Sequence, residues 1–313
     1  MAKEAGIEGF CYWHYWMGNG KLLLQRPFQE VLSSGKPDYP FCLAWANHDW
    51  KTGTWKKGGS SKMIVPMLYT GDKDYINHFN YVLPAFKDHR YITIDGKPIF
   101  VIFDPYSFKD ISHFINLWRN LAIENGLKGI YFIALIHSTT TMRRDKQGTI
   151  TRILPNLHSS EQVYKDILDL GFDGINSFGK PRAEMLYLGK YRRIFSSIIH
   201  KKFPFLPSLK LNYPKVMENF FAPEDNWENI FPTIFPQWDR TPRAGNSEGI
   251  YTHATPENFK THINQALDII NNKSDEHKIL FLRSWNEWGE GNYVEPDATY
   301  GHGFLNAISE TIK

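Results

Sequence analysis

Short apolar runs alternate along this chain with longer stretches of helical spacing. Short apolar runs are typical of strands buried on both faces, whereas apolar positions three or four residues apart are typical of amphipathic helices. We expect strands over residues 9–16, 41–46, 98–103, 130–136, 173–178, 230–238 and 279–282. We expect helices over residues 3–8, 22–34, 74–86, 110–125, 160–170, 191–200, 255–271 and 303–312, with the rest of 179–229 irregular.

This order gives seven strand-then-helix units, with polar and aromatic residues gathered after the strands. The pattern predicts an α/β fold with a parallel sheet, and the number of units points to a (β/α)8 TIM-like barrel in one catalytic domain, residues 1–313. A doubly wound sheet would usually carry a glycine-rich phosphate turn, and neither GxGxxG nor GxxxxGK[ST] occurs. A closed barrel needs eight strands. Either residues 63–69 supply one, or the chain is truncated and lacks its first strand at the N-terminus.

The chemistry is concentrated after the last predicted strand, in the stretch Leu280–Pro296, LFLRSWNEWGEGNYVEP. Glu287 and Glu290 lie three residues apart between two tryptophans and two glycines. Tryptophan faces stack on sugar rings, carboxylates transfer protons, and glycines let the backbone approach a ligand closely. The pattern therefore predicts a sugar site with Glu287 and Glu290 as the catalytic pair. The alternative is an ion pair or a set of hydrogen bonds that holds the loop.

Further candidates for substrate binding follow other strands, at the edge where a barrel has its active site. For His14 and Trp45 a buried role in the core is the alternative. Asn47, a polar residue at a strand end, is expected to hydrogen-bond to the substrate. The full set of predicted binding residues is His14, Tyr15, Trp16, Trp45, Asn47, Asp49, Trp50, Trp238, Asp239, Asn286 and Trp288.

Composition narrows the function classes. A formal net charge of +3 is too small to indicate nucleic-acid binding. The two cysteines, Cys11 and Cys42, lie in apolar runs and are expected to be buried free thiols. No apolar run approaches the length of a membrane span, and no signal peptide opens the sequence, so we expect a cytoplasmic protein. The absence of HExxH, a cysteine pair motif or a DxD-like acid pair indicates no metal, and we expect no cofactor.

The motifs resemble those of the WbsX-type family, whose members are often named as glycosyltransferases of surface-polysaccharide gene clusters. The resemblance covers nearly the whole chain, through AKEAGIEGFCYWHYW, SSGKPDYPFCLAWANHDW, YITIDGKPIF, FPQWD and SWNEWGEGNYVEPD. That family looks related to the endo-α-mannosidase group of glycoside hydrolases, which are barrel enzymes with a very similar Asn-Glu-Trp-x-Glu-Gly motif. Family members usually begin with an extra strand. They also more often carry Glu-Asn where this chain has His48-Asp49.

The resemblance implies roles for the acidic pair. In endo-α-mannosidases the first glutamate of the motif acts as base on the 2-hydroxyl of the sugar, and the second acts as general acid and then base. Carried over to this sequence, Glu287 is the base and Glu290 the acid/base. Three functions remain open: a hydrolase of α-mannosides or similar sugars in a polysaccharide, a glycosyltransferase that builds O-antigen or capsule, and a glycan-binding barrel without catalysis.

Overall fold

The computed structural model describes residues 1–52, 62–137, 142–144, 150–152, 156–189, 195, 198–199, 202–203, 206, 208–244 and 249–312. No helix in these ranges has both the length and the apolar character needed to cross a membrane. The strands are β1 Phe10–Trp16, β2 Leu22–Leu23, β3 Phe41–Trp45, β4 Trp50–Lys51, β5 Met63–Val65, β6 Thr93–Ile94, β7 Lys97–Ile102, β8 Tyr131–His137, β9 Met142–Arg144, β10 Ile150–Arg152, β11 Gly174–Phe178, β12 Lys210–Asn212, β13 Ile230–Ile234, β14 Ile250–Thr252, β15 Phe281–Leu282, β16 Asn286–Glu287 and β17 Asn292–Tyr293. The helices are α1 Ala2–Ala5, α2 Arg26–Ser34, α3 Asp72–Phe86, α4 Ile111–Glu124, α5 Glu161–Asp169, α6 Lys180–Leu188, α8 Tyr213–Met217, α9 Thr241–Ala244, α10 Pro256–Ile270 and α11 Gly303–Ile312, with 3₁₀ turns η2 Pro223–Asn226, η4 Asp275–His277 and η5 Trp288–Glu290.

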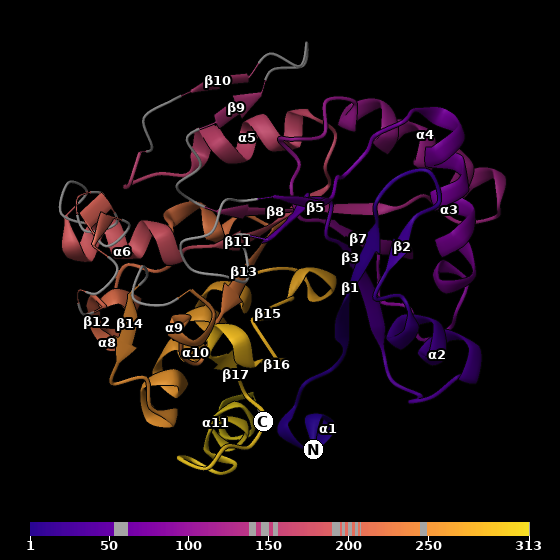
Figure 1. Ribbon diagram of the computed structural model, residues 1–313. Helices are drawn as coiled ribbons and strands as arrows, with labels where there is room; N and C mark the ends of the chain where they lie inside the picture. The colour runs from indigo at the N-terminus through magenta and orange to yellow at the C-terminus, as the bar shows by residue number, and fades with distance from the viewer. Residues whose placement is uncertain are drawn as a thin grey trace.

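One large, mostly parallel sheet organises the fold, in the order β15-β13-β11-β8-β7-β3-β1-β2, with β6 paired to β7 (Figure 1). Every neighbouring pair from β15 to β1 is parallel, and β2 joins β1 antiparallel. Helical connections carry the chain between most of these strands. All seven predicted strands are present in this sheet, so the predicted α/β order is confirmed.

The two ends of this sheet curl toward each other. Phe10 of β1 packs edge-to-face against Trp285, just after β15, with 5.7 Å between the ring centroids. Helix α1, at the N-terminus, contacts α11, at the C-terminus, and Figure 1 shows the two chain ends next to each other. Among the described residues no pairing joins β15 to β1. The structure is thus a curled, half-barrel sheet, and a closed (β/α)8 barrel stays a prediction.

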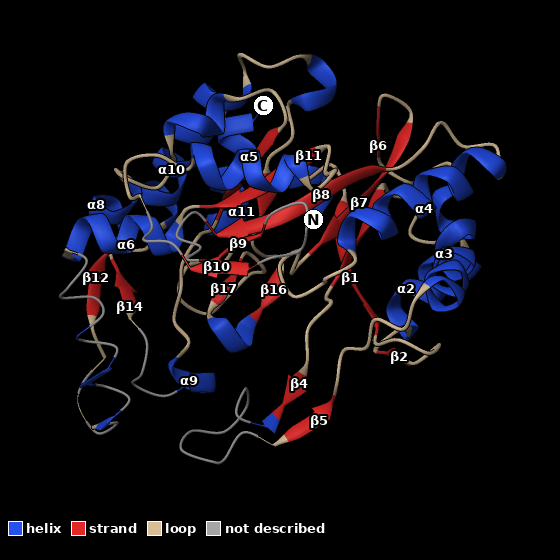
Figure 2. Ribbon diagram, turned by 90° about the horizontal axis from the view of Figure 1, so that it is seen from above, coloured by secondary structure: helices blue, strands red, loops and turns tan. Residues whose placement is uncertain are grey.

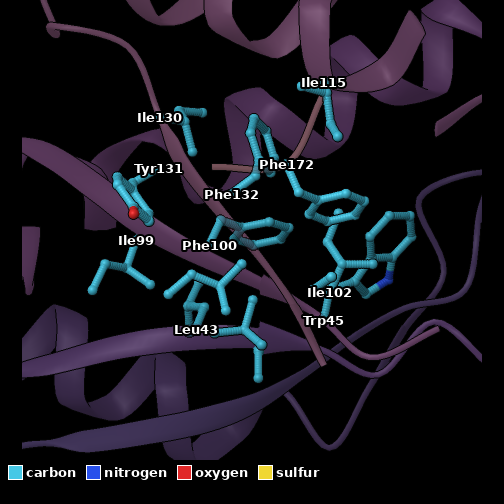
Figure 3. Packing of buried hydrophobic residues seen from close by; sticks show 14 of the residues in the cluster. Leu43, Trp45, Ile99, Phe100, Ile102, Ile115, Ile130, Tyr131, Phe132 and Phe172 are labelled. Carbon is cyan, nitrogen blue, oxygen red and sulfur yellow. The ribbon is translucent and has the colours of Figure 1, made fainter. Parts of the chain in front are cut away.

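The helices cover one face of the sheet through a core rich in aromatic rings. Leu43, Phe100 and Phe132 of neighbouring strands point into this core (Figure 3). Trp118 of α4 is fully buried and lies 4.9 Å from the Phe100 ring. Such rings remove large apolar areas from water, at about 25 cal/mol per Å². This packing fixes the face of each strand that turns toward the helices.

The predicted helix over 22–34 begins later than the sequence suggested. Leu22 and Leu23 form β2 and pair with the end of β1. Leu24 takes a φ of 48°, which breaks regular structure, and α2 then begins with Pro27 in its first turn. The apolar Leu22–Leu24 run supports either a strand or a helix, and pairing with β1 decides for the strand.

The prediction that the rest of 179–229 is irregular was wrong in part. Helix α6 follows β11 directly, and α8 and η2 come later. Helix α6 was missed because its apolar residues do not form one stripe. Residues 63–69 do not supply an eighth strand of the main sheet, because only β5 forms there and it pairs with β4. The helix predicted over 191–200 falls mostly outside the described residues.

Two buried histidines pack β1 against α3. His14 and His78 share a hydrogen bond between their Nε2 atoms, at 2.8 Å. The His78 ring stacks on Trp16 at 4.8 Å, and the Tyr81 ring stacks on His14. The Trp16 indole donates to Asp74. Burial lowers the pKa of His14 to about 3 and holds the pKa of His78 well below its ordinary value.

We expect these histidines to make the fold acid-sensitive. The unfolded chain binds protons at these groups near pH 6.5, while folded His14 binds one only near pH 3. The free energy of unfolding should therefore show no loss from these histidines above about pH 6.5, and it should fall progressively as the pH is lowered toward 3. The melting temperature measured across this window checks the expectation. His78→Phe should flatten the dependence, whereas the exposed control His302→Asn should leave it unchanged. Equal slopes in both variants would contradict it.

Candidate active site

A short hairpin after β15 carries the two predicted catalytic carboxylates. β16 pairs antiparallel with β17, and η5 lies between them. The Ser284 hydroxyl accepts a hydrogen bond from the Glu287 N–H at 3.1 Å, which fixes the start of the hairpin. Gly291 turns the chain with a φ of 57°, and a Cβ there would lie 2.7 Å from the Asp239 carbonyl oxygen. Only glycine fits this close approach, which brings Glu290 against the segment after β13.

Glu290 is bound by two arginines of that segment. Arg243 Nη1 donates to Glu290 Oε1 at 3.0 Å, and Arg240 Nε lies 3.3 Å from the same oxygen. Arg243 Nη1 also lies 3.9 Å from Glu287 Oε1. The Glu290 side chain is 13% exposed and that of Glu287 is 44% exposed. Arg243 therefore links the two carboxylates, one mostly covered and the other open to solvent.

A third arginine, Arg283, lies near Glu287 and Glu290. The Arg283 guanidinium carbon is 4.7 Å from the Phe178 ring centroid and 5.4 Å from that of Trp238. Lys180 Nζ lies 4.6 Å from the same Trp238 ring. Burial lowers the pKa of Arg283, and the charge of Glu290 acts in the opposite direction. Arginines that follow β13 and β15 therefore lie near the carboxylates, whereas Lys180 pairs with Glu184 of α6.

The carboxyl end of β1 reaches the same cluster. Burial raises the pKa of Tyr15, the nearby charge of Glu287 raises it further, and Arg243 lowers it. The Tyr15 ring also packs edge-to-face against Trp50 of β4 at 5.4 Å. Segments from both ends of the sheet therefore meet beside Glu287. Figure 2 shows the hairpin strands β16 and β17, and α9 contacts η5 between them.

Trp288 presents a broad aromatic surface next to Glu287. It is 47% exposed, and one of its faces stacks on Tyr293 with centroids 3.6 Å apart and an interplanar angle of 15°. Its indole N–H donates to Glu295 Oε2 at 2.7 Å. An aromatic ring held from behind and from its edge keeps its orientation while it stays open to a ligand.

Three predicted binding residues lie instead in the core under the helices. His14 is 2% exposed, Trp16 is 4% exposed and Trp45 is 1% exposed. The Trp45 indole donates to the Trp16 carbonyl, and the Trp45 ring packs against Phe114 of α4. For His14 and Trp45 the buried role that the sequence left open is the observed one, and the prediction that Trp16 binds substrate is corrected to a buried role.

Asn47 and Asp49 hold loops together at the same edge of the sheet. Asn47 is fully buried and bonds both backbone groups of Asp104: its Nδ2 donates to the carbonyl and its Oδ1 accepts from the N–H, each at 2.7 Å. It also donates to the Tyr69 hydroxyl. Asp49 accepts from the Met67 N–H at 2.9 Å, and this bond is the largest cause of its lowered pKa.

The remaining predicted residues surround the acidic pair at different depths. Trp238 is 4% exposed beneath Arg283, so its ring supports the arginine. Asp239 accepts a hydrogen bond from the Thr241 N–H, which starts α9. Asn286 is exposed on the hairpin. In the part of the chain that the structure describes, no group of three or more His, Cys, Asp or Glu side chains is arranged to hold a metal ion.

The sequence did not predict the arginines or Trp13. Arg240 directly follows the predicted Trp238-Asp239 pair, which was the available signal for it. Trp13 lies mid-strand in β1 yet is 42% exposed, with its ring 5.7 Å from that of Phe103. Because side chains alternate along a strand, Trp13 shares the face of Tyr15 and not that of the buried His14. The aromatic surface beside the site therefore continues down β1.

Comparison with known proteins identifies the family of the chain. The family model described as "Glycosyltransferase WbsX" matches residues 1–308, and the chain belongs to this family. Two curated relatives from Xanthomonas campestris pv. campestris, both described as uncharacterized protein WxcX, are 24% and 23% identical over 315 aligned residues. The alignment covers 100% of this chain and 40% of each relative, so the chain spans less than half of their length.

Two similar solved structures carry names that refer to glycoside hydrolases. A "Glycoside hydrolase-like protein" superposes with a TM-score of 0.57 at 15% identity, covering 100% of this chain and 83% of the other. The GH99 endo-α-mannosidase from Bacteroides thetaiotaomicron gives a TM-score of 0.52 at 14% identity, covering 99% and 76%. At such identities the likeness concerns the fold. The family and its structural neighbours are carbohydrate-active enzymes, glycosyltransferases or glycoside hydrolases.

Proposed function

We propose that this chain is a carbohydrate-active enzyme that cleaves glycosidic bonds in a polysaccharide, in the manner of an endo-α-mannosidase. One observation carries the proposal: Arg243 links Glu287 and Glu290 at the carboxyl edge of the sheet, beside the exposed Trp288. Paired carboxylates beside an open aromatic ring suit the bond between two sugar rings. The substrate in this proposal is an oligosaccharide or polysaccharide with α-linked mannose or a similar sugar.

The two carboxylates take different parts in the proposed reaction. Glu287, the more exposed of the pair, removes the proton from the 2-hydroxyl of the sugar, and that oxygen attacks the anomeric carbon. Glu290 donates a proton to the leaving oxygen and afterwards takes one from the water that completes hydrolysis. Trp288 supports the sugar ring from one face.

The arginines position Glu290 for this role. Both contact its Oε1, and no described residue hydrogen-bonds its Oε2, so Oε2 is the oxygen available to a substrate. A guanidinium group also fixes the plane of the carboxylate it binds. Because Arg243 contacts both acids, it keeps their separation constant while protons move.

Product analysis tests the proposal. The chain is incubated with a panel of α-linked manno-oligosaccharides, and new reducing ends are measured by chromatography. The double variant Glu287→Gln/Glu290→Gln serves as the blank. We expect cleavage by the wild-type chain only. If neither protein cleaves any glycan and both bind one equally well, the site is a binding site and the proposal is wrong.

A second candidate function is transfer from an activated sugar. The family name points to glycosyltransferases, and three arginines near the acids form a guanidinium set of the kind that binds phosphate groups. Incubation with sugar nucleotides and an acceptor glycan separates the two functions. Release of the nucleoside diphosphate together with a lengthened acceptor, without cleavage of any α-glycoside, would establish transfer.

Trp288→Ala is expected to weaken substrate binding more than turnover. Loss of an aromatic contact of about 1.5 kcal/mol corresponds to roughly a tenfold rise in KM. Trp288→Phe should recover most of it, because Tyr293 still supports the ring from behind. Tyr187→Ala removes another exposed ring, from α6, and serves as the control. An unchanged KM in Trp288→Ala would exclude the stacking role.

A further inference from the structure

The two cysteines of the chain face each other across neighbouring strands. Cys11 of β1 and Cys42 of β3 are direct register partners in the parallel sheet. Both are free thiols, and the neighbouring Cys11 side chain together with burial raises the pKa of the Cys42 thiol well above its ordinary value. The next pair on this face is Trp13 and Ala44, so the thiols lie on the face of the sheet that α3 does not cover. The expectation of two buried thiols was wrong for Cys11, which is exposed.

The geometry of the pair suits a disulfide. Neighbouring strands lie about 4.8 Å apart, within the range of about 4.4–6.8 Å that Cα atoms span in disulfides. The two thiols also differ in access, because Cys11 is exposed and Cys42 is only 3% exposed. An oxidant in solution therefore meets Cys11 first, and the partner thiol is already in contact with it.

We propose that Cys11 and Cys42 form a reversible redox site in which a hydroperoxide oxidises Cys11 and Cys42 then closes a disulfide between β1 and β3. In the first step the Cys11 sulfur attacks the peroxide, the O–O bond breaks, and Cys11 becomes a sulfenic acid as water or an alcohol leaves. In the second step the Cys42 sulfur attacks the Cys11 sulfur and releases water. The two thiols lose two electrons, which reduce one peroxide.

A disulfide at this site would link β3 to β1, a strand that has few backbone pairings on its other edge. β1 pairs with β3 from Phe10 to His14, but β2 covers its other edge only at Tyr15 and Trp16. A bridge between residues 11 and 42 closes a long loop and restricts the unfolded chain, so the oxidised protein should melt several degrees higher. The site lies at the amino ends of β1 and β3, away from Glu287, and the inference does not rest on the proposed enzymatic function.

The test uses the whole chain, reduced and freed of reductant, then titrated with hydrogen peroxide. We expect free thiols to fall from two to none, the intact mass to show the loss of two hydrogen atoms, and a tryptic map to show residues 11 and 42 in one linked species. Dithiothreitol should restore both thiols, and non-reducing gels should show monomer throughout.

Single variants separate this site from nonspecific oxidation. In Cys42→Ser, Cys11 should retain added oxygen or form intermolecular dimers, and in Cys11→Ser, Cys42 should resist the same peroxide dose. Cys42→Ala replaces Cys42→Ser if the latter does not fold, and the map of the wild-type chain decides without either. A wild-type chain that keeps both thiols, gains only oxygen atoms, or links only between molecules would overturn the proposal.

Discussion

Replacing Glu290 by glutamine should lower kcat/KM by about 10³-fold or more while the fold is retained. Glutamine keeps the size of the side chain but cannot transfer a proton. Its amide still offers an oxygen to Arg243 and Arg240, which now contact Glu290 Oε1 at 3.0 and 3.3 Å. Steady-state kinetics on the cleaved glycan, with circular dichroism at equal concentration, provide the measurement.

The control for this variant is Glu310→Gln. Glu310 forms an ion pair with Lys260 at 3.0 Å, as Glu290 does with Arg243, but on α10 and α11. The Glu310→Gln variant should keep the wild-type activity, because an exposed ion pair of this kind contributes only about 0–1 kcal/mol to stability. A Glu290→Gln chain as active as the Glu310→Gln control would remove Glu290 from the mechanism.

Asn47→Ala should lower the free energy of unfolding by about 3 kcal/mol. The side chain is fully buried, and it bonds the N–H and the carbonyl of Asp104 and the Tyr69 hydroxyl. Alanine leaves these groups without partners where water does not reach them, which is more costly than losing an exposed hydrogen bond. Urea unfolding followed by tryptophan fluorescence measures the change.

Asn286→Ala provides the matched control, since Asn286 is exposed on the hairpin and its loss should change stability by less than about 0.5 kcal/mol. The comparison separates a structural role for Asn47 from the substrate contact that the sequence suggested. An Asn47→Ala chain that is as stable as the wild type, with a greatly raised KM, would favour the substrate contact.

The strand order could be predicted because each strand of the main sheet is a local apolar run followed by a helix. The closure of the sheet could not, because it depends on contacts such as Phe10 against Trp285, which are distant in the sequence. The sequence also did not show which side chains of each strand face the helices. In β1 both alternating sets are aromatic, so the pattern did not show that His14 and Trp16 lie under α3 while Trp13 and Tyr15 do not.

The acidic pair was predictable because its residues are neighbours in the chain. The arginines that bind it were not, since Arg243 lies 47 positions from Glu290 and they meet only when β13 and β15 pair. Gly291 is the residue where sequence and geometry agree most closely. Its place in the motif suggested close approach, and the backbone of Asp239 is the group it approaches.

The most direct test of the central claim is a crystal structure of the Glu290→Gln chain with an α-linked oligosaccharide. The account predicts one sugar ring against the open face of Trp288, its 2-hydroxyl within hydrogen-bond distance of Glu287 and the next glycosidic oxygen within that distance of residue 290. A glycan bound elsewhere on the chain, with the side chains of residues 287 and 290 in contact only with Arg240 and Arg243, would contradict the account.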